Sequence, residues 1–200
     1  EHFSLVPPIL HTIRTVGIGE SDLETRLRDV HFDGLELGFR STFPENHIKL
    51  LFRPDVPEAT RTATIADVLE RVGARAFGVD SGDIAEVTAQ RLTARGQTLA
   101  LAESCTGGKL AAWLTDAPGA SRFLVEGAVV YANAAKMRTC GVPAGILEAH
   151  GAVSGPVARQ LATGIRDRAD TTWGVGVTGI AGPGGATESK PVGRVHIAVA

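Results

Sequence analysis

Several features that mark particular classes of protein are scarce in this sequence of 200 residues. It contains two cysteines, Cys105 and Cys140, which are too few for the disulfide framework of a small secreted domain. These cysteines and the six histidines also lack the clustered spacing of a zinc site. We therefore predict a protein of the reducing cytoplasm that holds no metal.

Neither the charged nor the apolar residues form long runs. The 20 Lys and Arg and the 22 Asp and Glu residues give a formal net charge of -2 and are spread along the chain. With an aromatic content of 5%, the sequence offers no basic patch or aromatic platform for a nucleic acid. No apolar run approaches the roughly 18 residues of a membrane-spanning helix, and no targeting leader opens the chain. The start at Glu1 rather than Met indicates a fragment or a processed chain.

A hydrophobic content of 44% is enough for a sizeable core, and residues 1–79 predict a small α+β domain. Ser21 opens a capping-box pattern that predicts a helix over 21–30. Apolar residues alternate over 35–53, as they do in a hairpin. A second helix carries one apolar stripe and ends at Gly73.

Residues 80–200 predict a second domain, of the α/β class, because helical and strand-like segments alternate with short connections. We expect a three-layer sandwich around a mostly parallel mixed sheet. The expected elements are, in order, a helix over 83–95, a strand over 98–102, a helix over 108–115, a strand over 123–131, a helix that carries Lys136, a helix after Ser154, and strands over 173–177 and 194–200.

Two glycine-rich segments follow predicted strands, where ligands bind in open α/β sheets. Residues 102–108 read Ala-Glu-Ser-Cys-Thr-Gly-Gly, and residues 179–185 read Gly-Ile-Ala-Gly-Pro-Gly-Gly. The first segment opens a helix, so its amides could stabilise a phosphate or a developing oxyanion. A tight turn with close helix packing explains the same glycines about equally well. The second segment, with Lys190 after it, suits an anionic ligand.

Ser104 follows the end of a predicted strand, as a nucleophile does, although the Gly-x-Ser-x-Gly pattern is absent. Its hydroxyl needs a base, and no histidine is near in sequence. Lys136, which follows Tyr131 and Asn133, could serve if burial lowers its pKa. Taken alone, Ser104 is more often a helix cap and Lys136 a solvated helix residue. Cys105 is a rival nucleophile, although free cysteines are more often buried and inert.

Four ordered motifs nevertheless make the chain resemble the CinA family, the competence/damage-inducible proteins. The motifs are residues 102–108, the Gly-x-Val-x-Tyr-x-Asn-x-x-Lys pattern of residues 127–136, the turn 150–154, and the loop 178–193. The resemblance implies that 80–200 is the family's C-terminal deamidase domain. It further implies that 1–79 holds the tail of an N-terminal domain and the family's small middle domain.

The resemblance implies an amidohydrolase that deamidates nicotinamide mononucleotide to nicotinic acid mononucleotide and ammonia in pyridine-nucleotide salvage. Ser104 would be the nucleophile, Lys136 its base, and Tyr131 a neighbour in the site. No metal or organic cofactor is implied, and the partners expected are the nucleotide substrate and further copies of the chain. The residues expected to bind substrate are Thr106, Gly107, Gly108, Asn133, Gly179, Ile180, Ala181, Gly182 and Lys190.

Two departures from the family pattern qualify these expectations. Full-length members begin with a molybdopterin-binding-like domain linked to ADP-ribose pyrophosphatase activity, which we do not infer for this chain. The family's C-terminal domain also continues into a further strand and a helix that bring an arginine to the site, whereas this sequence ends at Ala200. The sequence therefore leaves open an alternative, a non-catalytic nucleotide-binding or regulatory module.

Overall fold

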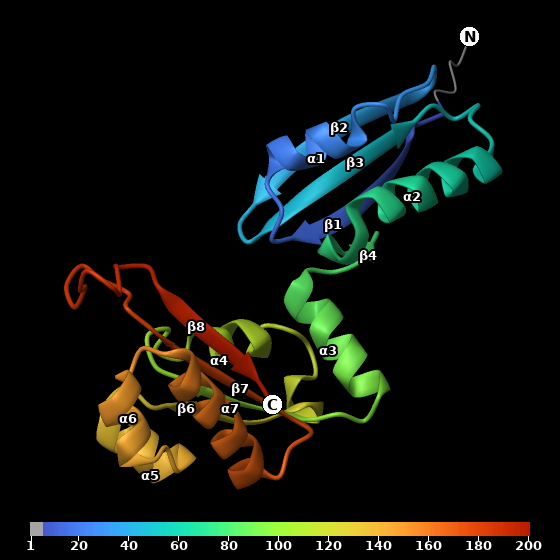
Figure 1. Ribbon diagram of the computed structural model, residues 1–200. Coiled ribbons are helices and arrows are strands. Elements are labelled where there is room, and N and C mark those ends of the chain that lie inside the picture. Colours follow the sequence, from blue (N-terminus) through green and yellow to red (C-terminus); the bar gives the residue numbers. More distant parts are fainter. Residues whose placement is uncertain (1–5) are drawn as a thin grey trace. The chain divides into compact units, whose positions relative to one another are not determined.

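The computed structural model describes residues 6–200, which divide into two compact units between Val87 and Thr88 (Figure 1). The division lies inside helix α3 (Ile84–Ala94), later than the boundary expected after residue 79. The segment after residue 79 still belongs to the first unit. In it, the Ile84 amide donates a hydrogen bond to Glu45 Oε1 at 2.8 Å.

The first unit is a four-stranded antiparallel sheet in the order β2-β3-β1-β4, with helices α1 and α2 packed into one core with it. That core contains Ile13, Leu23, Leu50 and Val68. The elements are β1 (Ile9–Val16), α1 (Glu20–Leu27), β2 (Leu35–Thr42), β3 (Glu45–Phe52), α2 (Glu58–Val72), the 3-10 turn η1 (Gly73–Arg75) and β4 (Ala76–Val79).

The structure confirms the hairpin, as β2 and β3, and the helix that ends at Gly73. The predicted cap of α1 is wrong. The helix begins one residue earlier and its N-cap is Gly19, while Ser21 lies in the first turn and its carbonyl accepts a hydrogen bond from the Thr25 hydroxyl. Strand β1 was not expected, because His11 and Thr15 interrupt the apolar face on which Ile9 and Ile13 lie.

The second unit contains a mixed sheet in the order β6-β5-β7-β8. Strand β5 is parallel to β6 and β7, and β8 is antiparallel to β7, so the predicted, mostly parallel sheet is confirmed. All five residues of β5 are buried, as in a strand covered on both faces. The strands are β5 (Leu99–Glu103), β6 (Leu124–Val129), β7 (Trp173–Gly179) and β8 (Val195–Val199).

Helices cover both faces of this sheet and complete the three layers (Figure 1). Ala100 and Ala102 of β5 point into a core shared with α7, whereas Gly127, on the opposite face, lies against Ala111 of α4. Helix α7 begins directly after Ser154, as expected, and the Ser154 side chain caps it. The helices and the second 3-10 turn are α4 (Lys109–Thr115), η2 (Ala120–Arg122), α5 (Asn133–Cys140), α6 (Ala144–His150) and α7 (Gly155–Ala169).

Helix α6 was not expected, and His150, which we expected in a turn, is its last residue. The helix has seven residues and none of them is fully buried, so its apolar pattern is too short to stand out. Between residues 6 and 200, no helix combines the length and apolar character that crossing a membrane requires.

Candidate active site

The carboxyl ends of β5, β6 and β7 bring the sequence motifs to one edge of the sheet, as the parallel arrangement requires. Ser104 directly follows β5, and its amide donates to the Val177 carbonyl of β7 at 3.0 Å. On the other side, the Val130 amide donates to the Glu103 carbonyl at 2.7 Å. These bonds extend the ladders past the strand ends and fix the main chain around Ser104.

Lys136 reaches Ser104 from helix α5. Its Nζ atom lies 3.0 Å from Ser104 Oγ, 3.0 Å from the Val130 carbonyl oxygen and 2.7 Å from the Tyr131 carbonyl oxygen. A neutral amine has two N–H groups, which the two carbonyls accept, and one lone pair, which then faces the Ser104 hydroxyl. The main chain around β6 therefore holds Lys136 Nζ beside Ser104 Oγ.

Burial determines which form of Lys136 is favoured. The side chain is 1% exposed, and burial lowers the pKa of its ammonium group, while the thiols of Cys105 and Cys140 act weakly in the opposite direction. Within residues 6–200, no carboxylate lies at ion-pair distance from Lys136. Desolvation without a compensating anion favours the neutral amine, which is the form that a general base requires.

The turn after Ser104 is held by Glu103, a carboxylate that is 1% exposed. Its Oε2 atom accepts from the amides of Gly108 at 3.2 Å and Leu110 at 3.0 Å, and Oε1 accepts from the Ala111 amide at 2.8 Å. Gly108 has a φ of 95°, a left-handed value that side-chain-bearing residues rarely adopt. The glycine lets the chain turn sharply into α4.

Only some amides of this turn remain available to a substrate. Gly107 donates to the Ser104 carbonyl at 3.1 Å, and Gly108 donates to Glu103. In the described part of the chain, the amides of Cys105 and Thr106 have no main-chain acceptor, although both lie close enough to the Cys105 sulfur to favour its thiolate. The Thr106 hydroxyl is also buried without a partner among these residues. The amide after a nucleophilic serine is the usual donor to a tetrahedral oxyanion, and Cys105 is the residue in that position after Ser104, with Thr106 next to it.

Cys105 is half-buried beside the end of β7. A Cβ atom on Gly179 would lie 2.9 Å from its sulfur. Burial raises the pKa of the Cys105 thiol, with smaller opposing contributions from nearby amides and Lys136. The less reactive thiol form is therefore favoured over the thiolate, and Ser104 is the stronger candidate nucleophile.

Tyr131 and Asn133 lie at the solvent edge of the site. The Tyr131 residue is 69% exposed, and it is its main-chain carbonyl that contacts Lys136. Asn133 is exposed as the first residue of α5. Both side chains can therefore meet a ligand that arrives from solvent.

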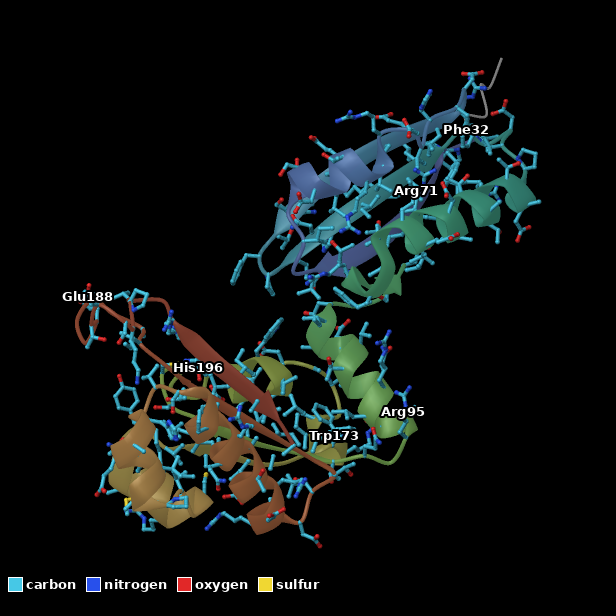
Figure 2. All side chains as sticks on the ribbon, viewed as in Figure 1. Phe32, Arg71, Arg95, Trp173, Glu188 and His196 are labelled. Carbon is cyan, nitrogen blue, oxygen red and sulfur yellow. The ribbon has the colours of Figure 1, made fainter. Side chains whose placement is uncertain are left out.

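The loop between β7 and β8 contains the remaining predicted residues. Ile180 donates to the Arg194 carbonyl at 3.0 Å, whereas Ala181 and Gly182 are exposed and, among residues 6–200, their amides have no main-chain acceptor. Lys190 Nζ donates to the His150 carbonyl at 2.8 Å, which ties the loop to the end of α6. Figure 2 shows Glu188 at the outer end of this loop, which projects beyond the sheet.

Comparison with known proteins assigns the chain to a family. A family model described as the CinA C-terminal domain matches residues 81–200. A CinA-like protein of Anaeromyxobacter sp. (strain K) is 48% identical over 198 residues, which cover 96% of this chain and 48% of that protein. The chain belongs to the CinA family.

A CinA-like protein of Myxococcus xanthus (strain DK1622) is 43% identical over 192 residues and covers 94% of the chain. The chain spans about half the length of these CinA relatives. A crystal structure of the competence/damage inducible protein CihA from Agrobacterium tumefaciens superposes with a TM-score of 0.55 and is 42% identical. This match covers 59% of the chain and 74% of the solved one. A CinA superfamily protein from Escherichia coli gives a TM-score of 0.53 at 36% identity and covers 58% and 73%.

In this CinA chain, the sequence singled out Ser104 and Lys136, which the structure brings into contact, but it did not single out the groups that hold them. The carbonyls of Val130 and Tyr131 and the carboxylate of Glu103 were not singled out. Main-chain acceptors leave no trace in a sequence. Glu103 did leave one, because a charged residue at the end of an otherwise apolar strand needs buried partners.

Proposed function

We propose that this chain is an amidohydrolase that converts nicotinamide mononucleotide to nicotinic acid mononucleotide and ammonia. The observation that carries the proposal is the buried contact of 3.0 Å between Lys136 Nζ and Ser104 Oγ. This distance lies within the range of about 2.6 to 3.2 Å expected for a nucleophile and its base. The choice of substrate rests on the resemblance to the CinA family.

Ser104 Oγ attacks the carboxamide carbon while its proton moves to Lys136 Nζ. The amides of Cys105 and Thr106 donate to the oxyanion that forms. Lys136 then gives the proton to the departing nitrogen, so ammonia leaves and an ester with Ser104 remains. A water molecule, deprotonated by Lys136, attacks this ester, and the proton returns to Ser104 as the nicotinic acid product is released. The cycle returns both side chains to their starting forms.

The rest of the nucleotide lies along the same edge of the sheet in this proposal. The exposed amides of Ala181 and Gly182 and the ammonium of Lys190 are suited to its phosphate. Gly107 and Gly108 shape the turn, while Asn133 and Tyr131 flank the entrance. Gly179 lies beside Cys105, and Ile180 continues the chain from it into the loop.

The test is ammonia release from nicotinamide mononucleotide by the wild-type chain and by Ser104→Ala. The variant is expected to lose about three orders of magnitude or more in kcat, because the covalent route is removed. Ser121→Ala is the matched control, since Ser121 is exposed in η2, and it should keep the wild-type rate.

Two results contradict the proposal. Ser104→Ala could release ammonia at the normal rate, which would exclude Ser104 as the nucleophile. The wild-type chain could instead bind the nucleotide in calorimetry without turning it over, which would favour the non-catalytic binding module.

A further inference from the structure

Glu103 is a buried charged residue that the proposed reaction does not use. It lies directly before Ser104 and is 1% exposed. Among residues 6–200, no Lys, Arg or His lies at ion-pair distance from it. A buried carboxylate without a nearby cation needs other hydrogen-bond donors. The Glu103 carboxylate accepts hydrogen bonds from three main-chain amides.

These three bonds close the turn that presents Ser104. The chain leaves β5 at Glu103, passes through Ser104, and returns to the Glu103 carboxylate at Gly108, Leu110 and Ala111. Ser104 is therefore held from two directions. Its own N–H donates a hydrogen bond to the Val177 carbonyl, and the turn that follows it is closed by Glu103. The same hydrogen bonds occupy the amides at the start of α4, so these amides are not free to bind a substrate anion.

We propose that Glu103 is a positioning residue, whose carboxylate holds the 104–107 turn closed and so keeps Ser104 Oγ in line with Lys136. The inference rests on the proposed function, because it takes Ser104 as the nucleophile. A displacement of Ser104 by about 1 Å is enough to slow attack by about two orders of magnitude. The effect of Glu103 is therefore on reactivity at Ser104 and not on affinity for substrate.

The three acceptor contacts need a carboxylate of this length. In Glu103→Gln, one of the two oxygens becomes an NH2 group, which cannot accept from the α4 amides and opposes their N–H groups. In Glu103→Asp the charge stays, but the side chain is one methylene shorter and cannot reach the same amides. The two variants separate the loss of an acceptor from the loss of reach.

The experiment measures Ser104 directly, with a fluorophosphonate probe that forms a covalent bond to an activated serine. The rate of phosphonylation is followed by mass spectrometry in wild type, Glu103→Gln and Glu103→Asp. Glu126→Gln is the matched control, because Glu126 lies on the neighbouring strand and pairs with Arg168. Circular dichroism and the thermal midpoint establish that each variant is folded.

We expect Glu103→Gln to be labelled about 10- to 100-fold more slowly than wild type, with Glu103→Asp between them. Glu126→Gln should match wild type. With nicotinamide mononucleotide, kcat should fall by a similar factor while KM changes little, since the loss lies in the reacting geometry.

Equal labelling of wild type and Glu103→Gln would overturn the inference, as would a rise in KM with kcat unchanged. Failure of both Glu103 variants to fold would assign Glu103 a purely structural role and also overturn it. A third outcome separates the two proposals: Ser104 is labelled in wild type and more slowly in Glu103→Gln, but no ammonia is released from nicotinamide mononucleotide. That result would reject the proposed substrate and still support the positioning role of Glu103. If Ser104 of the wild-type chain is not labelled, both the proposed nucleophile and the positioning role of Glu103 are rejected.

Discussion

At the scale of single residues, the protonation of Lys136 decides whether Ser104 can react. Burial lowers the pKa of Lys136, so the neutral amine is present from a lower pH than in a solvated lysine. Labelling of Ser104 by a fluorophosphonate should therefore rise with pH through the lowered pKa of Lys136 and level off above it. Lys136→Met should abolish this dependence and slow labelling by about two orders of magnitude or more, since a general base is lost.

Lys49→Met, in strand β3 of the first unit, is the control for this loss of a lysine, and Ser104 in that variant should be labelled at the wild-type rate.

The lowered pKa of Lys136 also predicts an effect of pH on stability. Between the folded and unfolded pKa values of Lys136 the unfolded chain binds more protons, so wild-type stability rises with pH in that window. The thermal midpoint of Lys136→Met relative to wild type should accordingly fall as pH rises. A relative midpoint that did not change with pH would contradict a lowered pKa.

Cys105 provides a second test at this scale, because it is the rival nucleophile. Burial raises the pKa of its thiol, so the thiolate is disfavoured at neutral pH. We expect Cys105→Ala to keep kcat within about threefold of wild type, an effect of packing rather than of lost chemistry. Ammonia release is the measurement. A loss as large as that of Ser104→Ala would show that the reacting atom is sulfur.

At the scale of elements, the clearest local patterns were predictable and the tertiary ones were not. The helix that ends at Gly73 and the helix that begins after Ser154 were both predicted from neighbouring residues. Gly19 as the cap of α1 was missed, because a glycine cap carries no side-chain signal. The sequence placed Ser104 just after one strand and Lys136 on the helix that follows the next, but only the fold could show which carbonyls and amides surround them.

The packing of α7 on the sheet gives a prediction for this scale. A methyl group on Gly176 of β7 would overlap the Ala158 carbonyl and Leu161 of α7. Gly176→Ala should therefore lower the free energy of unfolding by about 2 kcal/mol or more, because neither backbone can yield without cost. Gly38→Ala is the matched control, since a Cβ at that strand glycine meets nothing within 4 Å. Chemical denaturation measures both, and equal stability of the two variants would refute the close packing.

At the scale of the whole molecule, the residues of the proposed site all belong to the second unit, and the family match covers residues 81–200. The cores of the two units are built from separate sets of side chains. Leu50 belongs to the first core and Leu161 to the second, and both are fully buried. The stability of the second unit should therefore depend on Leu161 and not on Leu50.

We expect Leu50→Ala and Leu161→Ala each to destabilise its own unit by about 2 to 5 kcal/mol, because each leaves a cavity in a close-packed core. Leu50→Ala should shift one unfolding transition and leave the labelling of Ser104 unchanged. Leu161→Ala should shift the other and abolish labelling at a lower temperature than in wild type. Calorimetry combined with probe labelling during heating measures both effects. If either substitution moved a single shared transition, the two cores would be one cooperative unit, and the first unit would then contribute to the stability of the site.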